Sequence, residues 1–565
     1  MLEALRGSLA PSARAFVEER APLASLPVCQ VELQLDPDGS KLSGHERLTF
    51  ASPGASPLGD VVLRMAAGAG EKAASLRLAD VKAGGRPARA ERLRAGTWRV
   101  ALEPPVAPGE RVELDLTFFA DVPSLPPGAD DPTTQALAAL GALGGAVAAG
   151  VDDHAQFDST AEGAMLLAEA FPMLAPWRDG AWDAAAAAPS GDAGDGAPAN
   201  VLLSVVAPRG FAAVAPGALL GAVPEPDGRT RATFAAAAIR GGGVVLAKDL
   251  RRTVKPVGDV EVEVYAAPGS EADAAKSLAL AADVLARFTR RFGPYPWRQL
   301  RVVDVALAGG AGGLELPGVV VLAASLSRAA SGQPAPLAGT EVLDGLREHA
   351  LAHELAHEWW GLVVGSNPRR DPAVAEPLAQ YAALLFEEAA HGAKRAKQAA
   401  DGQVALGYQL FRAGGGADGP AARPADKFKD ELEYAALVGG KAPLFYRAAR
   451  TLLGDKDFTR ALQSYYRAYA FREAGPQSFV EEAAKVAPAK AARLRSLWTR
   501  WMREAHGDED LGSLDVASLL GAITGQPVDD QTRALMKSMA PMLDQLMKGQ
   551  GLDLGDLEPD AGSPP

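Results

Sequence analysis

Residues 345–365, GLREHALAHELAHEWWGLVVG, contain the pattern that decides the fold of this chain. His353 and His357 are four positions apart, and Glu354 directly follows the first histidine. No glycine or proline interrupts residues 346–360, which predicts a helix. Side chains four positions apart lie on one face of a helix, so both imidazoles can reach one metal ion. Glu354 can then reach a water molecule at that ion without being a ligand, which is the arrangement that zinc-assisted hydrolysis requires.

Chance is a poor explanation of this pattern. With 7 histidines and 70 acidic residues among 565, about 0.01 occurrences are expected in a random order. The alternative interpretation is that His353 and His357 are ordinary surface histidines. A further histidine, His349, lies one helical turn earlier. We interpret it as a packed or half-exposed residue, with an accessory role at the metal as the alternative, because three histidines of one helix do not fit one tetrahedral ion comfortably.

A third ligand is expected in RRDPAVAEPLAQYAALLFEE, residues 369–388. Glu376 stands 19 positions after His357 and heads a second segment with helical apolar spacing. This interval allows the first helix to end, a loop to turn back and a second helix to lie against it. Pro377 disfavours helical geometry in the residue before it, but proline fits the first turn of a helix. Alone, Glu376 would be interpreted as a solvated glutamate favoured by the helix dipole; beside two histidines, it completes the usual three zinc ligands.

The order and spacing of these residues resemble the gluzincin aminopeptidases, the family of aminopeptidase N and leukotriene hydrolase. The resemblance implies one zinc ion held by His353, His357 and Glu376, with Glu354 as the general base. HEWWG, the apolar LVVG after it and Tyr381 also look like the family.

The resemblance covers about residues 28 to 506, with its strong motifs within 293–381. It implies a thermolysin-like catalytic domain, without the long C-terminal helical domain of many relatives.

A second family motif lies upstream of the histidines. RRFGPYPWRQLRVVDVA resembles the stretch that leads into the strand at the substrate, and GGLELPG, residues 312–318, stands where the family has Gly-x-Met-Glu-Asn. The resemblance assigns Glu315 to the free α-amino group of the substrate, with Gly312 and Gly313 beside the substrate. A buried carboxylate that needs a cation opposite it is a physical means of selecting peptide N-termini. Leu314 and Leu316 replace the methionine and asparagine of the family pattern.

One family position is not filled as expected. The family has a tyrosine that stabilises the transition state two residues before a Lys-Gly pair, and here Lys441 fits while Gly439 stands in place of the tyrosine. Loss of one such donor typically costs about 10²–10³ in rate. Tyr434, five residues upstream, is our candidate for this role. Tyr446, seven residues downstream, or an unfilled role are the alternatives.

The rest of the chain predicts more than one domain. Residues 28–255 show alternating apolar and polar runs separated by turns, which predicts an all-β sheet domain with a low-complexity insertion at about 124–200. Residues 256–506 predict a mixed α and β, mostly helical catalytic domain that follows an N-terminal segment, 1–27, and the sheet domain. The fold class is therefore multidomain α and β.

The last segment, 507–565, is acidic and holds four of the nine methionines, Met536, Met539, Met542 and Met547. Their spacing predicts a helix with one apolar face. Docking of that face on the chain's own core is one interpretation, and binding of a protein partner is the other.

Composition narrows the class of function. Hydrophobic residues make up 48% and charged residues 22%, which excludes a globally disordered chain. The net charge of −13 argues against nucleic-acid binding, and Cys29 as the only cysteine excludes an intramolecular disulfide. Charges interrupt residues 1–29, so no secretory signal is expected, no membrane span is expected, and a cytoplasmic location is the simplest expectation.

These observations favour a zinc metallopeptidase, an aminopeptidase that acts on short peptides with a free N-terminus. The alternative from another class is a zinc-binding protein with impaired catalysis that serves as a binding or scaffold module. An endopeptidase on the same scaffold is a further alternative.

Overall fold

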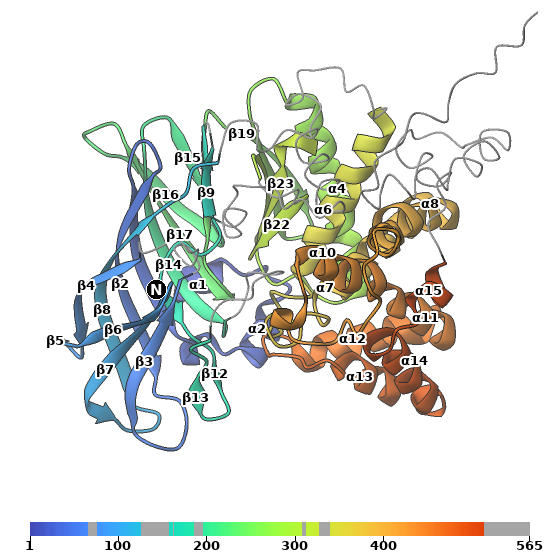
Figure 1. Cartoon of the computed structure of the whole chain (residues 1–565). Coiled ribbons are helices and arrows are strands. Elements are labelled where there is room, and N and C mark those ends of the chain that lie inside the picture. Colours follow the sequence, from blue (N-terminus) through green and yellow to red (C-terminus); the bar gives the residue numbers. More distant parts are fainter. Residues whose placement is uncertain are drawn as a thin grey trace, which may run out of the picture.

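The computed structural model describes residues 1–65, 76–125, 158–161, 163–185, 196–307, 312–326 and 340–512. The predicted methionine-rich helix and parts of the 124–200 insertion lie outside these residues. A sheet-rich N-terminal region is followed by a mainly helical C-terminal region, and the two lie side by side in Figure 1. This order confirms the fold class predicted from the sequence. The domain boundaries expected near residues 255 and 506 stay a prediction.

The N-terminal region is built on an eight-stranded sheet. Its strands, in spatial order, are β16 (Ala218–Pro224), β17 (Thr230–Ile239), β14 (Ala199–Ala207), β1 (Val28–Leu35), β2 (Lys41–Ala51), β8 (Arg111–Asp121), β4 (Arg77–Ala83) and β5 (Arg86–Pro87). β1 pairs with β14 in parallel, with Val28 opposite Asn200, and its pairing with β2 is antiparallel. Buried and more exposed residues alternate along β2 and β8, so one face of the sheet faces the core.

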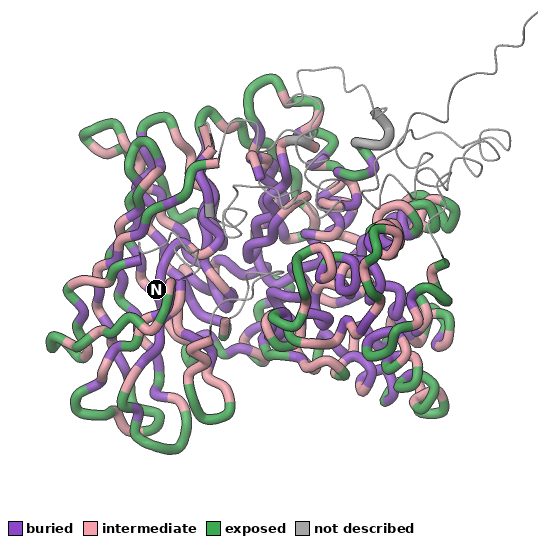
Figure 2. Tube along the Cα trace, in the orientation of Figure 1, coloured by how far each residue is buried: buried purple, intermediate pink, exposed green. Residues whose placement is uncertain are grey.

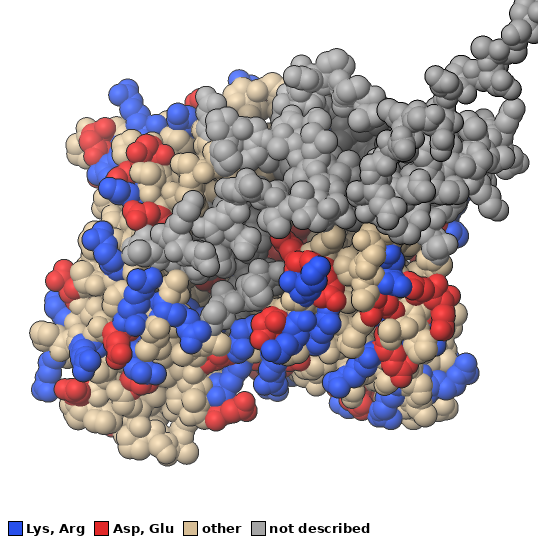
Figure 3. All heavy atoms as spheres, viewed as in Figure 1, with Lys and Arg blue, Asp and Glu red and all other residues tan. Residues whose placement is uncertain are grey.

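Smaller sheets complete this region. One contains β15 (Phe211–Val214), β18 (Val244–Lys248), β10 (Ala164–Leu167) and β9 (Asp158–Ala161), and another contains β11 (Met173–Leu174), β3 (Leu58–Arg64), β7 (Thr97–Val106) and β6 (Ala90–Arg94). A short hairpin joins β12 (Trp177–Arg178) and β13 (Ala181–Trp182). Figure 3 shows positive and negative side chains intermingled over the described part of one face of the molecule.

One inward position of β2 holds a carboxylate. Glu46 is fully buried next to the thiol of Cys29, and neither of its oxygens has a hydrogen-bonding nitrogen or oxygen partner in the described part of the chain. Burial raises the pKa of Glu46 from its ordinary value of 4.5 to about 8. The folded protein therefore holds a proton here that the unfolded chain releases at neutral pH.

We expect this proton to make stability fall as the pH rises. Between pH 4.5 and about pH 8, the Glu46 contribution should lower the free energy of unfolding by about 1.4 kcal/mol per pH unit. The contribution is fully present below the unfolded pKa and is lost as the pH passes through the folded pKa. Urea denaturation across this window should show the slope in the wild type and a flatter profile in Glu46→Gln. Identical pH profiles would contradict the prediction.

The C-terminal region begins with a five-stranded sheet. In spatial order it contains β19 (Arg251–Val257), β20 (Val260–Ala266), β21 (Gln299–Val305), β23 (Val319–Ala323) and β22 (Gly313–Leu316). β20, β21 and β23 are parallel, and the two edge strands run antiparallel to their neighbours. Helix α4 (Glu271–Arg291) joins β20 to β21, and β22 lies at the edge next to helix α6 (Thr340–His357).

Helices form the remainder of this region. They are α7 (Glu376–His391), α8 (Ala393–Ala399), the π-helix η3 (Ala400–Ala405), α9 (Leu406–Ala413), α10 (Glu431–Tyr434), the π-helix η5 (Ala435–Lys441), α11 (Pro443–Leu453), α12 (Asp455–Tyr469), α13 (Ser478–Val486), α14 (Ala491–Arg503) and α15 (Gly507–Leu511). Helix α6 packs against α4 and α7. No helix within the described residues is both long and apolar enough to cross a membrane.

The N-terminal segment connects the two regions. Its helices α1 (Leu2–Gly7) and α2 (Arg14–Arg20) lie between them in Figure 1. The backbone carbonyl of Ser8 accepts a hydrogen bond from Arg298 at 2.8 Å, and the Ser8 hydroxyl accepts one from the backbone of Ala237 in β17 at 3.1 Å. Buried apolar residues of both regions form one continuous cluster, and Figure 2 shows buried segments running through both.

Candidate active site

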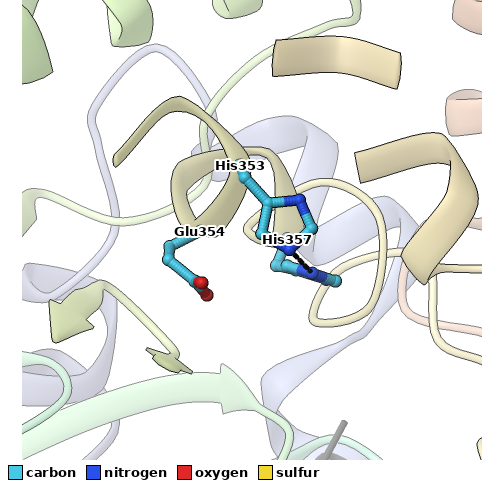
Figure 4. Close-up of side chains that lie close together, drawn as sticks. All are labelled: His353, Glu354 and His357. Atoms are coloured by element: carbon cyan, nitrogen blue, oxygen red, sulfur yellow. Dashed lines mark hydrogen bonds between the residues drawn. The ribbon is translucent and has the colours of Figure 1, made fainter. Parts of the chain in front are cut away.

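Helix α6 carries the predicted motif in its last two turns. His353, Glu354 and His357 project from the end of this helix, and their nearest ligand atoms lie within 4.8 Å of one another. Figure 4 shows Glu354 beside the two imidazoles. The chain turns sharply after the helix at Gly361, whose φ is +137°, and Trp359 in this turn is fully buried. The end of α6 is therefore anchored in the core.

Helix α7 supplies the third residue. Glu376 is the first residue of α7 and Pro377 is the second, as predicted, because proline fits where no helical N–H bond is made. Oε2 of Glu376 lies 3.4 Å from Nε2 of His353 and 3.2 Å from Nε2 of His357. The two Nε2 atoms are 3.2 Å apart. The structure thus brings together all three residues expected to bind metal.

These three atoms fit a zinc ion. Ligands at about 2.0–2.1 Å in tetrahedral geometry lie about 3.3 Å from one another, which matches the three separations. Nδ1 of His357 lies 3.0 Å from the carbonyl oxygen of Trp360, to which it donates, so in the neutral ring Nε2 presents a lone pair. Nitrogen and carboxylate donors in this geometry are a zinc ligand set.

The electrostatics of the site agree with metal binding. Burial lowers the pKa of His353 and so favours the neutral ring. Burial alone would raise the pKa of Glu376, but the neighbouring His353 and His357 outweigh it and hold that pKa well below its usual range. Neutral imidazoles with an ionised carboxylate are the protonation states that a metal requires.

Strand β22 passes directly beside Glu354. A Cβ atom at Gly313 would lie 2.5 Å from Cγ and 2.8 Å from Oε1 of Glu354, so only glycine fits there without a shift. A Cβ atom at Gly312 would meet Ala350 of α6 at 3.4 Å. Both predicted glycines therefore lie along helix α6, and Glu354 itself is 6% exposed.

Glu315 also lies on β22 and is buried. The turn that follows it is held by Glu358, a residue that the sequence reasoning missed. Both carboxylate oxygens of Glu358 lie 3.0 Å from the backbone N–H of Gly318 and accept from it. Burial raises the pKa of Glu358 well above its ordinary value, and the charge of Glu315 adds to this effect. The sequence offers one signal for this residue: Glu358 follows a ligand histidine and precedes two tryptophans. A carboxylate buried in such surroundings needs a hydrogen-bond donor.

Gly439, which stands in place of the family tyrosine, lies next to Glu376. A Cβ atom at Gly439 would meet Oε1 of Glu376 at 3.7 Å, which is an ordinary contact. Tyr434 immediately precedes the π-helix that contains Gly439, and its ring packs edge-on against Phe428 with centroids 5.2 Å apart. Tyr446 is buried in an aromatic cluster with Tyr381.

His349 does not join the ligand set. Its ring nitrogens lie 2.8 Å from Oε1 of Glu387 and 3.0 Å from Oε1 of Gln380, both on α7. This agrees with the interpretation of His349 as a packed histidine, because the side chain is only 10% exposed and both nitrogens have partners.

Comparison with known proteins agrees with this geometry. Residues 277–501 match the peptidase family M1 domain. The fold is similar to the M1 zinc metallopeptidase from Deinococcus radiodurans, with a TM-score of 0.58 and 20% identity over 84% of this chain and 93% of that chain. A mutant of that organism's M1 zinc metallopeptidase bound to a Tyr-Ser-Ala substrate matches with a TM-score of 0.58 and 18% identity, over 85% of this chain and 94% of that chain.

A mutant two-domain M1 zinc metallopeptidase bound to L-tryptophan matches with a TM-score of 0.60 and 19% identity, over 84% of this chain and 94% of that chain. The matched domain contains His353 and His357 of α6, together with Glu354 and Glu376. Residues 277–501 therefore form a peptidase family M1 domain, in agreement with the resemblance to the gluzincin zinc peptidases.

Proposed function

We propose that this protein is an aminopeptidase, which removes N-terminal residues from short peptides. The observation that carries the proposal is the convergence of His353, His357 and Glu376 next to Glu354. His353, His357 and Glu376 would hold zinc, which when bound acts as a Lewis acid on the peptide carbonyl and makes water a better nucleophile.

Glu354 is proposed as the group that moves the proton. It takes a proton from the attacking water as the C–O bond forms, and it passes that proton to the peptide nitrogen as the C–N bond breaks. Its burial beside β22 keeps its carboxylate out of bulk water. One water molecule is consumed, and the products are a free amino acid and a shortened peptide.

Strand β22 is proposed to bind the substrate. It is the edge strand of its sheet, so an extended peptide can pair with its outer side. Glu315 on this strand would face the α-ammonium group of the peptide, which provides the cation that a buried carboxylate requires. The Tyr-Ser-Ala substrate of the Deinococcus radiodurans relative supports a peptide substrate for this chain.

The test is hydrolysis of aminoacyl fluorogenic amides with a free or an acetylated amino group. Free amides are expected to be cleaved about 10- to 100-fold faster in kcat/KM, because a hydrogen bond to a charged group contributes about 1.5–3 kcal/mol. The difference should shrink in Glu315→Gln. Chelation should abolish turnover, and added zinc should restore it. Equal cleavage of the acetylated amides would favour the endopeptidase instead.

A specific observation favours a second candidate. Gly439 lies opposite Glu376 where the family has a tyrosine, so a zinc-binding module with impaired catalysis fits that feature. One bound zinc ion without turnover of any peptide would support this candidate.

A further inference from the structure

A series of hydrogen bonds runs from Glu376 through Gln380 and His349 to Glu387. We name Gln380, His349 and Glu387 the carboxylate support. Nε2 of Gln380 donates to Oε1 of Glu376 at 3.3 Å, while Oε2 of Glu376 faces the two ligand imidazoles. Oε1 of Gln380 lies 3.0 Å from Nε2 of His349, and Nδ1 of His349 lies 2.8 Å from Oε1 of Glu387. The support therefore connects the proposed metal ligand to a second carboxylate, with one residue from α6 and two from α7.

The direction of each hydrogen bond follows from the chemistry of its partners. The ionised carboxylate of Glu376 accepts only, so Gln380 turns its NH₂ group toward it and its carbonyl oxygen toward His349. That oxygen can only accept, so Nε2 of His349 donates. Nδ1 of His349 forms the last hydrogen bond of the series, with Oε1 of Glu387 at 2.8 Å.

Burial makes this arrangement specific. Glu387 is 0% exposed, and its carboxylate lies beside the His349 ring and 3.7 Å from Nε of Arg395. His349 is itself buried. Hydrogen bonds at both ring nitrogens fix the orientation of this buried ring, since rotation would leave buried polar groups unpaired.

Glu376 needs such a support because of where it stands. It is the first residue of α7, and no side chain approaches it from Gly439 on the neighbouring π-helix. A carboxylate that is free to rotate would exchange its two oxygens at the metal. The hydrogen bond from Gln380 removes this freedom by occupying Oε1, which leaves Oε2 for the ion.

We propose that Gln380 and His349 are positioning residues that fix the Glu376 carboxylate for metal binding through one oxygen. This inference rests on the proposed zinc site but not on the proposed reaction. Groups that orient metal ligands in this way typically contribute about 10- to 100-fold to metal affinity.

The experiment measures zinc affinity of the full-length protein by competition with a fluorescent chelator. Gln380→Leu should raise the zinc Kd about 10- to 100-fold, and Gln380→Glu should do the same because it keeps the size but removes the N–H donor. His349→Phe should also weaken zinc binding. In the Gln380→Leu background it should add no more than about twofold, because His349 reaches Glu376 only through Gln380. Circular dichroism and thermal melting check that each variant is folded.

His391→Phe is the matched control. His391 of α7 pairs with Glu348 of α6 at 2.7 Å, so it ties the same two helices together without reaching Glu376. It should leave the zinc Kd unchanged.

The outcomes separate the proposals. Wild-type zinc affinity in folded Gln380→Leu, or losses that multiply in the double variant, would overturn the support. His349→Phe removes a hydrogen-bond partner of the buried Glu387 and can therefore prevent folding. In that case Gln380→Leu carries the test. A wild type that binds zinc but cleaves no peptide would overturn the proposed function and leave this inference standing. A wild type that binds no zinc would overturn both.

Discussion

Glu354→Gln is expected to lower kcat for peptide hydrolysis by about 10²–10⁴, the usual contribution of a positioned acid–base group. Glutamine has nearly the same size and keeps the packing against β22, but it cannot take a proton from water. Glu354 is not among the three residues whose atoms converge on the metal position, so zinc content should stay at the wild-type level. The fold should also persist, because the substitution removes a buried charge rather than a contact.

Initial rates on a free-amino aminoacyl amide, with zinc measured in the same samples, test this expectation. Glu348→Gln is the control, since Glu348 lies on the same helix but pairs with His391 away from the site. Full activity in Glu354→Gln would remove the basis for the proposed proton transfer. Loss of zinc together with activity would show that Glu354 acts on the metal instead.

Tyr434→Phe is expected to lower kcat by about 10²–10³, the cost of removing one donor to the developing oxyanion. A π-helix bonds residues five apart, and Tyr434 stands five residues before Gly439 at the start of η5. Tyr434 is thus about one turn before Gly439 along the chain, which makes it our candidate for the donor. KM should change little if the hydroxyl acts only in the transition state.

A rescue variant makes this test sharp. A Cβ atom at Gly439 meets no tight contact and lies next to Glu376, so Gly439→Tyr should recover activity in the Tyr434→Phe background. Tyr446→Phe should leave kcat unchanged, because Tyr446 is buried among aromatic rings. Unchanged kcat in Tyr434→Phe, combined with a gain in Gly439→Tyr alone, would show that the donor position is unfilled in the natural chain.

The sequence was sufficient for those parts of the site that depend on local spacing. His353 and His357 share a helix face whatever surrounds them. The 19-residue interval to Glu376 holds one loop and a helix start, and Pro377 identifies that start. The alternation along strands such as β2 likewise predicts which residues face the core.

Contacts between elements could not be predicted in this way. His349 meets Gln380 across 31 residues, and Gly318 meets Glu358 across 40. Which side chains meet across two helices depends on their crossing angle and rotation, and a single sequence does not specify these. For this reason the sequence left open whether His349 is packed or half-exposed; in the structure helix α7 covers it.

The N-terminal segment has a consequence for how the protein unfolds. Ser8 is hydrogen-bonded to both β17 and Arg298, the residue before β21, and one apolar cluster extends through the sheet-rich and helical regions. Neither region can separate without exposing that cluster to water, so the free energies of the two are coupled. The sheet-rich and helical regions should therefore melt together in a single calorimetric transition. A catalytic region produced without the sheet-rich region would need polar substitutions on the apolar face that this region covers before it could fold by itself.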